Sequence, residues 1–303
     1  SEDEPADNVE KGDCSNLDLA ALANGQFHNP QQIISGAKAA AQECGGEVQG
    51  AGPSALDTQA QYSIFQDLVI SGVDAIVMIA YPAEFWIKPI DEAVGQGIAI
   101  STADVASPSS LQSIYAGPKV SDLGRALANT IIDEVGEDAT GKVVTGLCLP
   151  DLDVISSRYV GFKNVFAERA PGVEVSDPYN VTFDNVENYS KWQEIVTTSE
   201  PDAMAYVGFC ENDLNNLAKI KHDTGGDFII ASVGINPESL AAVQSGDALF
   251  VVGQKPFLQG YVGMRAMIES ILSGNETPRG WVDIGPEIVT TENVEEVIAR
   301  EQS

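Results

Sequence analysis

Short apolar runs alternate with amphipathic stretches along almost the whole chain. The runs that predict β-strands are residues 17–23, 75–79, 98–101, 143–147, 203–207, 228–233 and 250–252. Between them, apolar residues recur at helical spacing within residues 33–44, 57–69, 159–166, 189–196 and 257–271. Strands that alternate with helices in this way predict βαβ units and parallel sheets.

The pattern restarts near residue 142. Gly141 and Lys142 precede a second apolar strand, which is followed by its own series of βα units. The chain has 303 residues, which is enough for two domains. We therefore expect an α/β protein of two similar doubly wound parallel-sheet lobes, with helices on both faces of each sheet.

Functional residues are expected in the loops that follow the strands, because open α/β sheets bind ligands at the carboxyl ends of their strands. These loops are residues 24–29, 80–86, 102–104, 149–158, 182–185, 210–213, 234–237 and 253–255. They are rich in Asn, Asp, Gln and aromatic residues and hold one Arg, the groups that bind sugar hydroxyls and the apolar face of a sugar. The sequence has no evident Ser-His-Asp set, metal cluster or phosphate loop, so we expect no enzyme, no cofactor and no metal.

The charge of the chain narrows the choice of partners. It carries 45 acidic and 16 basic residues, a formal net charge of -29. This balance excludes a nucleic-acid binder, which needs clustered Lys and Arg, and disfavours a highly anionic ligand. No apolar run is long enough to span a membrane. Residues 1–14 are expected to form a mostly acidic, solvated tether, which fits a secreted or lipid-anchored protein.

One segment loosely matches a dinucleotide-binding fingerprint. It is Gly-Ala-Gly-Pro-Ser-Ala at residues 50–55. The fingerprint belongs after the first strand of a domain, with an acidic residue at the end of the next strand. Here the segment follows a second, short strand-like run at residues 47–49, and Asp74 precedes the next strand instead of ending it. We interpret the segment as a turn, which weakens the rival hypotheses of a nicotinamide-dependent dehydrogenase or another sugar-modifying α/β enzyme.

Short motifs follow one another in a characteristic order. The first half holds Asn-Pro at 29–30, Gly-Val-Asp-Ala-Ile at 72–76 and Gly-Ile-Ala-Ile-Ser-Thr-Ala-Asp at 97–104. The second half holds Arg-Tyr-Val-Gly-Phe at 158–162, Phe-Asp at 183–184, Asn-Asp at 212–213, Val-Gly-Ile-Asn at 233–236 and then Gln254. Over roughly residues 15–285, their order and spacing resemble the periplasmic sugar-binding proteins of the ribose-binding type, which have the type I periplasmic binding protein fold.

This resemblance implies two lobes joined by a three-crossing hinge, one of residues 15–117 plus 255–280 and the other of 118–254 plus 281–303. It implies a monomeric, extracytoplasmic solute-binding protein, periplasmic or lipid-anchored, that binds a small neutral sugar or polyol between the lobes. Lobe closure would then deliver the ligand to the membrane permease of an ABC importer. A transcription regulator of the same fold is the rival, but only an acidic segment precedes the first strand, where a basic helix-turn-helix would be needed.

The resemblance also implies a set of ligand-binding residues. They are Asn29, Gln31, Asp104, Arg158, Phe183, Asn212, Asn236 and Gln254, with Phe27 and Trp86 as further aromatic candidates. Each has a structural alternative: a salt bridge for the Arg, turns for the Asp and Asn residues, and core packing for the aromatic residues.

Four positions depart from the family pattern. Val105 replaces an Arg, Asn236 replaces an Asp, and residues 31–32 are Gln-Gln where the family often has two aromatic residues. A site rich in amides and poor in aromatic walls suits a polyol or a short sugar better than a pyranose ring. Residues 52–54 and 101–104 also look like the branch that binds a furanosyl autoinducer or a deoxysugar such as rhamnose, and this alternative stays open.

The four cysteines, Cys14, Cys44, Cys148 and Cys210, are either separate buried thiols or two disulfides. Cys14 precedes the first strand, and Cys44 ends the following helix, which returns toward the start of that strand. Cys148 and Cys210 follow the first and third strands of the second lobe, which are neighbours in a sheet of order 2-1-3. We therefore predict Cys14–Cys44 and Cys148–Cys210 bonds and an oxidising compartment.

Overall fold

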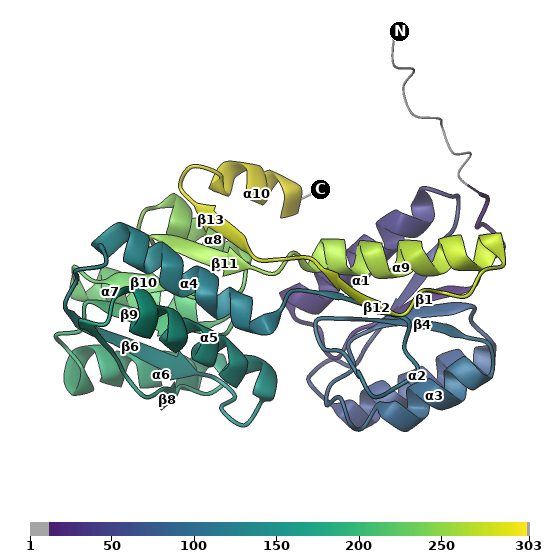
Figure 1. Cartoon of the computed structure of the whole chain (residues 1–303), viewed down its shortest axis with the longest axis horizontal. Coiled ribbons are helices and arrows are strands. Elements are labelled where there is room, and N and C mark those ends of the chain that lie inside the picture. Colours follow the sequence, from purple (N-terminus) through teal and green to yellow (C-terminus); the bar gives the residue numbers. More distant parts are fainter. Residues whose placement is uncertain (1–11, 302–303) are drawn as a thin grey trace, which may run out of the picture. The chain divides into compact units, whose positions relative to one another are not determined.

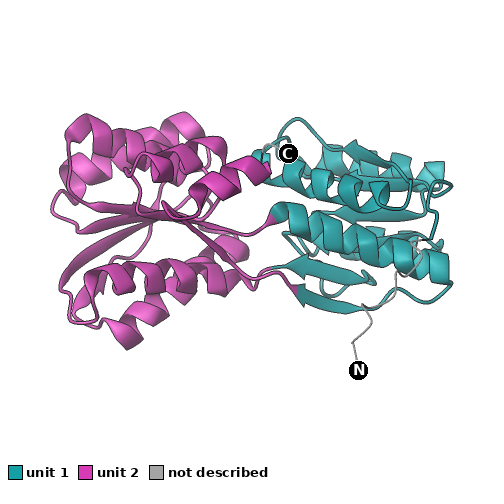
Figure 2. Cartoon of the chain, turned by 90° about the horizontal axis from the view of Figure 1, so that it is seen from above, with its two compact units in different colours: residues 1–117, 256–282 teal, residues 118–255, 283–303 magenta. Residues whose placement is uncertain are grey.

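The computed structural model describes residues 12–301, which divide into two compact units (Figure 2). Unit 1 comprises residues 12–117 and 256–282, and unit 2 comprises residues 118–255 and 283–301. The divisions of the structure fall before residues 118, 256 and 283, and those expected from the sequence fall before residues 118, 255 and 281. Residues 1–11 of the predicted tether and residues 302–303 lie outside the described residues.

Unit 1 is built on one largely parallel sheet (Figure 1). Its elements are β1 (Leu19–Leu22), α1 (His28–Gln42), β2 (Val48–Ala51), α2 (Thr58–Ser71), β3 (Ala75–Met78), α3 (Ile87–Gly95), β4 (Ala99–Ala103), β5 (Ile114–Gly117), α9 (Pro256–Ser273) and β12 (Gly280–Asp283). Among the described residues the strand order is β12-β5-β4-β3-β1-β2, and β1 to β5 pair in parallel.

Alternate residues of the unit 1 strands feed two separate cores. Leu19 and Ala21 of β1 pack with α1 and α9, whereas Ala20 and Leu22 pack with α2 and α3. Figure 1 shows α1 and α9 on one face of the sheet and α2 and α3 on the other. Because both faces are covered, β1 and β3 consist entirely of buried apolar residues.

Unit 2 is also built on a parallel sheet, and it has an additional antiparallel pair of strands. Its elements are α4 (Val120–Val135), β6 (Gly141–Leu147), α5 (Asp153–Arg169), β7 (Val173–Val175), β8 (Tyr179–Asn180), α6 (Asn185–Glu194), the π-helical turn η1 (Ile195–Ser199), β9 (Ala205–Gly208), α7 (Asp213–Thr224), β10 (Ile229–Ala231), α8 (Pro237–Gln244), β11 (Phe250–Gly253), β13 (Glu287–Thr290) and α10 (Val294–Glu301). The parallel sheet has the order β10-β9-β6-β7, with β8 also paired to β6, and β11 pairs with β13 in antiparallel fashion. The second and third strand segments thus flank β6, as the 2-1-3 order predicts.

Two helix pairs pack through glycines. In unit 1, a β-carbon on Gly36 would lie 1.8 Å from the Phe257 carbonyl oxygen, and one on Gly260 would lie 1.9 Å from that of Ile33. In unit 2, a β-carbon on Gly124 would lie 1.8 Å from the Arg158 carbonyl oxygen, and one on Gly161 would lie 2.1 Å from that of Ser121. Only glycine permits backbones to approach this closely. These four glycines therefore allow the backbone of α1 to contact that of α9, and the backbone of α4 to contact that of α5.

The structure contains both predicted disulfides. Cys14 is bonded to Cys44, with a Cα–Cα distance of 5.3 Å, and Cys148 is bonded to Cys210, with a Cα–Cα distance of 6.2 Å. The Cys14 amide also donates a hydrogen bond to the Cys44 carbonyl. Each bond joins residues of one unit, so neither disulfide ties unit 1 to unit 2.

A buried carboxylate organises the turn between β9 and α7. Asp213 has no exposed surface, and its side chain accepts hydrogen bonds from Asn188 Nδ2 (2.8 Å), Trp192 Nε1 (2.9 Å) and the Cys210 amide (2.9 Å). Burial raises the pKa of Asp213 to about 6, although these donors and the Phe209 amide act in the opposite direction. A β-carbon on Gly208 would lie 2.1 Å from that of Asp213, so the turn also requires glycine there.

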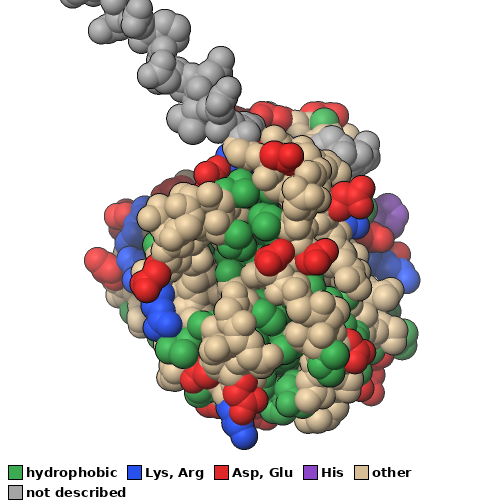
Figure 3. All heavy atoms as spheres, turned by 90° about the vertical axis from the view of Figure 1, so that its right-hand side faces the viewer, with side chains coloured by type: hydrophobic (Ala, Val, Ile, Leu, Met, Phe, Trp, Pro, Cys, Tyr) green, Lys and Arg blue, Asp and Glu red, His purple; other side chains and the backbone are tan. Residues whose placement is uncertain are grey.

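Acidic side chains are spread over the surface of unit 1 that Figure 3 presents. This distribution fits the interpretation of most carboxylates as a solvated surface, consistent with the net charge of -29. None of the helices within residues 12–301 combines the length and the apolar character that crossing a membrane requires.

The glycine packing yields the first prediction. Gly124→Ala is expected to lower the free energy of unfolding by about 1 to 3 kcal/mol, because the added methyl group meets the backbone of α5. Gly95→Ala is the matched control, since this helical glycine of α3 is exposed and a β-carbon added to it would have no atom within 4 Å. It is expected to be neutral or to stabilise by up to about 1 kcal/mol. Urea unfolding measures both; equal values for the two variants would contradict the close approach.

The raised pKa of Asp213 yields a second prediction. Its ordinary value is 3.8 and its folded value is about 6, so the folded protein retains a proton that the unfolded chain releases between these pH values. This contribution to stability is fully present below pH 3.8 and is lost as the pH rises to about 6. The loss amounts to about 3 kcal/mol.

The comparison with Asp213→Asn isolates this residue from the other carboxylates. The variant is expected to be less stable overall, because an amide cannot accept from every donor in the pocket. However, its side chain does not titrate. The wild-type free energy of unfolding minus that of the variant is therefore expected to fall between pH 4 and pH 7, as urea titrations at each pH will measure. A pH-independent difference would refute the assignment.

Candidate functional site

The candidate residues of unit 2 lie where its strands end, at the carboxyl edge. Arg158 lies on α5, which follows β6, and Phe183 follows β8. Asn212 follows β9, Asn236 follows β10, and Gln254 directly follows β11. Parallel strands bring such residues to one edge, as the sequence pattern predicts.

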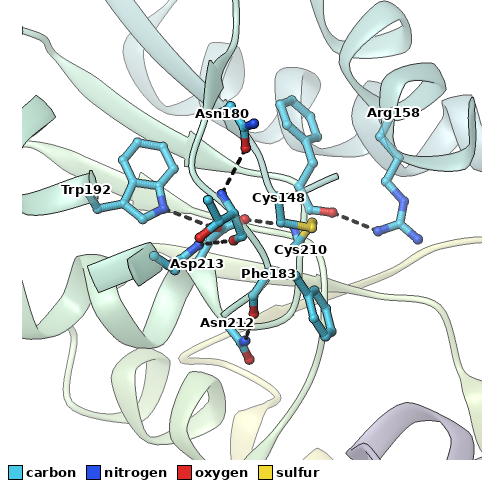
Figure 4. The surroundings of a disulfide bond; sticks show 11 residues. Cys148, Arg158, Asn180, Phe183, Trp192, Cys210, Asn212 and Asp213 are labelled. Carbon is cyan, nitrogen blue, oxygen red and sulfur yellow. Dashed lines mark hydrogen bonds between the residues drawn. A yellow bond between two sulfur atoms is a disulfide. The ribbon is translucent and has the colours of Figure 1, made fainter. Parts of the chain in front are cut away.

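Arg158 is the most enclosed charged group of this set. Its side chain is buried, its Nη1 donates to the Phe209 carbonyl at 2.7 Å, and its Nη2 lies 3.5 Å from Gln254 Oε1. Figure 4 shows the guanidinium directed toward that carbonyl. Its backbone is held from behind by Gly124 on α4. Arg158 therefore lies beside Gln254, and its burial differs from the exposed surface salt bridge that was its structural alternative.

Phe183 and Asn212 lie next to one another. Asn212 Nδ2 donates to the Phe183 carbonyl at 3.2 Å, and the Phe183 side chain is half-buried against the core that includes α4 and α5 (Figure 4). Thr182, just before Phe183, has a φ of 59°, and Asn188 Nδ2 donates to its carbonyl. Because Asn188 also donates to Asp213, the buried carboxylate links both segments.

Asn236 caps a helix. It is the N-cap of α8, where its Oδ1 accepts from the Ser239 amide at 2.7 Å and its Nδ2 donates to the Glu211 carbonyl at 3.1 Å. Its side chain is buried. This is the turn role that was the structural alternative for Asn236, and a ligand contact at this residue stays a prediction.

Asp104 occupies the corresponding edge of unit 1. It directly follows β4 and has a φ of 59°. Its amide donates to Oε1 of the fully buried Gln259 at 2.7 Å, and its carbonyl accepts from the Tyr115 hydroxyl at 3.0 Å. Two side chains thus fix the backbone of Asp104 in a conformation that favours glycine, a strain of the kind found at functional sites.

Two amide side chains lie between the end of β1 and the first turn of α1. Asn29 Oδ1 and Asn24 Oδ1 are both buried and have no hydrogen-bond partner among the described residues. Asn29 was predicted, whereas Asn24 was not singled out. Its position two residues after β1, beside Gly25, was the signal that could have identified it.

Two other candidates of unit 1 lie at the start of α1. Phe27 is the N-cap of α1 and is partly exposed, with its ring close to Gly25. Gln31 lies in the first turn of α1 and is exposed. Neither position is enclosed by unit 1 itself, so their roles toward a ligand remain predictions.

The structure corrects the expectation for Trp86. Its indole is fully buried, its Nε1 donates to the Tyr81 carbonyl at 3.0 Å, and its ring packs against Tyr62, Phe65 and Phe85. It belongs to the core between the sheet and α2 and α3. The ring is fully packed and its N–H has a hydrogen-bond partner, so the prediction that Trp86 contacts the ligand was wrong.

Two cavities within the units lie away from these residues. One, of about 640 Å³, is lined by Asp18, Glu47 and other residues at the amino ends of β1 and β2. The other, of about 390 Å³, is lined by residues such as Asp202 and Phe228 in unit 2. Neither cavity is lined by candidate ligand residues, which lie at the carboxyl edges of the sheets or on the helices that follow them.

The arrangement is suited to binding polar, uncharged ligands. A guanidinium donates only, an amide both donates and accepts, and a carboxylate accepts, which together satisfy hydroxyl groups in several orientations. The residues 12–301 contain no cluster of three or more His, Cys, Asp or Glu side chains that could hold a metal ion.

The chain matches known proteins along most of its length. Residues 21–276 match the family model described as a periplasmic binding protein domain. A curated relative, the ribose import binding protein RbsB of Bacillus subtilis, is 23% identical over 226 residues, which cover 74% of this chain and 71% of the relative.

Solved structures show the same fold. A sugar-binding protein of a sugar ABC transporter from Bacillus halodurans superposes with a TM-score of 0.84 at 20% identity, covering 92% of this chain and 99% of the other. An ABC transporter solute-binding protein from Burkholderia graminis, in complex with D-arabinose, superposes with a TM-score of 0.83 at 21% identity, covering 93% and 97%. The two-unit α/β architecture, the motif order and the match over residues 21–276 agree, and the chain belongs to the periplasmic binding protein family, with the type I fold that its motifs predicted.

Proposed function

We propose that this protein is the extracytoplasmic solute-binding component of an ABC importer and that it binds a small neutral sugar or polyol. Membership of the periplasmic binding protein family supports the transport role and the extracytoplasmic location. The relative from Bacillus subtilis carries the name of a ribose import protein, and one structural neighbour holds D-arabinose. In this proposal the chain binds its ligand without transforming it and passes it to a membrane permease.

The observation that carries the proposal is the environment of Arg158. A guanidinium at the carboxyl edge of unit 2 is buried and directed by the Phe209 carbonyl, with the Gln254 amide beside it. A pair of adjacent sugar oxygens is a partner that the planar fork of a guanidinium fits. Asn212 and Phe183, which lie next to one another at the same edge, would add an amide and an apolar ring.

Unit 1 supports the same ligand class with complementary groups. The buried oxygens of Asn24 and Asn29 are acceptors that require donors, which sugar hydroxyls supply. Asp104, held in position through its backbone, would add a carboxylate. We propose that the ligand contacts the carboxyl edges of both units, so that ligand binding favours a closed arrangement that the permease recognises.

The charge and the residues at 31–32 narrow the ligand further. A net charge of -29 repels acids and phosphates, which favours a neutral ligand. Gln31 and Gln32 lie in the first turn of α1, where the family often has aromatic residues, and amides offer no apolar wall for a pyranose ring. The proposed ligand is therefore a polyol or a pentose.

Replacing Arg158 tests the site. Arg158→Ala is expected to weaken sugar binding by about 2 to 5 kcal/mol, because the buried ligand oxygens lose their paired donors. Arg169→Ala is the matched control: Arg169 lies at the other end of α5 and pairs with Asp133 and Glu137 on the surface. Calorimetric titration should show wild-type affinity for the control variant, and circular dichroism verifies that both fold. Near wild-type affinity in Arg158→Ala would remove this residue from the site.

A thermal-shift panel tests the ligand class. Polyols of four to six carbons and pentoses are expected to raise the melting temperature more than glucose or galactose, because a tight ligand stabilises the folded state by mass action. Rhamnose and furanosyl sugars belong in the panel as the alternative ligands, and amino acids serve as negative controls. Strong stabilisation by hexopyranoses with no effect of polyols would overturn the proposed preference.

A further inference from the structure

The Cys148–Cys210 disulfide lies at the carboxyl edge of unit 2, among the candidate ligand residues. Both cysteines are buried, and Cys148 follows β6 while Cys210 follows β9 (Figure 4). The second disulfide lies at the opposite edge of its own unit, because Cys14 precedes β1 and Cys44 follows α1. Both are buried disulfides within one unit, but only the Cys148–Cys210 bond lies at an edge that carries candidate ligand residues.

The disulfide lies just beyond the end of the pairing between β6 and β9. The β6–β9 ladder runs from Val143 paired with Ala205 to Gly146 paired with Gly208, and it has no later pair. Cys148 and Cys210 each stand two residues beyond that last pair, and both belong to the core of unit 2 that includes residues of α4 and α5. Past the ladder, the disulfide is the covalent link between the two chain segments.

Each linked segment leads to a ligand candidate. Cys148 opens the loop that enters α5 and Arg158. Cys210 directly follows Phe209, whose carbonyl accepts from Arg158, and precedes Asn212 by two residues. The bond therefore joins the segment that carries the guanidinium to the segment that directs it.

Asp213 holds the same segment from its other side. Its carboxylate accepts from the Cys210 amide, from Trp192 and from Asn188, and Asn188 also donates to the Thr182 carbonyl beside Phe183. The Cys210 end is thus fixed by a covalent bond on one side and by a buried polar network on the other. Arg158, Phe183 and Asn212 depend on the position of these few residues.

We propose that the Cys148–Cys210 disulfide is a positioning element for the sugar site, which sets ligand affinity beyond its contribution to stability. This inference rests on the proposed sugar-binding function. Hydrogen bonds to a ligand depend steeply on placement, so a shift of about 1 Å in the Phe209–Asn212 segment weakens several contacts together. The Cys14–Cys44 bond, at the amino edge of unit 1, has no such effect.

The experiment compares two double variants. Cys148→Ala with Cys210→Ala is expected to lower the affinity for D-ribose, D-arabinose or xylitol, whichever binds the wild type most tightly, on the order of tenfold in calorimetric titration. Cys14→Ala with Cys44→Ala is expected to keep the wild-type affinity. Both are expected to lower the melting temperature, since each removes a cross-link. Equal affinities in the two variants, whether both retained or both reduced, would overturn the proposal.

Reduction provides a second route if the Cys148–Cys210 variant does not fold. In the Cys14→Ala, Cys44→Ala background one disulfide remains, and excess dithiothreitol converts it to two thiols with two electrons and two protons while the dithiol becomes a cyclic disulfide. Affinity is expected to fall on reduction and to return on reoxidation. An affinity that does not change while thiol titration shows complete reduction would contradict the positioning role.

Hydrogen exchange separates this inference from the proposed function. Without the Cys148–Cys210 bond, amides of residues 148–152 and 209–213 are expected to exchange faster, whereas those of α4 and the rest of α5 keep their protection. This readout needs no ligand. A wild type that binds no sugar would refute the proposed function, and unchanged exchange in these two segments would refute the positioning role.

Discussion

The contact of helix backbone with helix backbone, without intervening side chains, is the constraint on which both units rest. Gly36 and Gly260 permit it between α1 and α9, and Gly124 and Gly161 permit it between α4 and α5. Gly124 contacts the backbone carbonyl of Arg158, so this packing determines the position of the backbone from which the Arg158 side chain extends. The α1–α9 contact likewise holds the helix whose first turn carries Asn29. The placement of these candidate residues thus depends on glycines, which have no side chain.

Polar side chains hold the backbone of the segments that follow β4 and β9. In unit 1 the backbone of Asp104 is held by Gln259 and Tyr115, and in unit 2 the Phe209–Asp213 turn is held by Asp213 and a disulfide. Both devices fix the backbone of a segment that carries candidate ligand residues. The two units share this principle but use different residues for it.

The sequence predicted the parts of the fold that depend on apolar patterning. β1, β3, β6, β9 and β11 were all predicted, because strands buried on both faces form unbroken apolar runs. β12 was missed, since all its residues are exposed and it has no apolar pattern. β8 has two residues, which is too short for any periodicity. Two helices, α1 and α5, begin about one turn or more before their first predicted apolar residue, because their first turns do not follow the apolar pattern.

At the site, motif order identified where candidates lie but not how each side chain is used. Trp86 is indistinguishable in sequence from a ligand-facing aromatic residue, and its burial depends on Tyr62, Phe65 and Phe85. Asp213 was hidden for the same reason, because its burial requires Gly208 and donors from α6. The capping role of Asn236 was readable, since Pro237 and Ser239 follow it as they do at helix starts.

The discontinuous construction of the two units bears on how the chain acquires its fold. Unit 1 needs α9 to cover α1 and β12 to complete its sheet edge, yet both are encoded after the whole first segment of unit 2. The glycine face of α1 therefore has no partner until residues 256–273 are available, whatever its local helical propensity. Contacts between such distant segments slow folding, because loop closure precedes any gain from packing. A chain emerging from its amino end thus offers a chaperone an incomplete first unit for most of its synthesis.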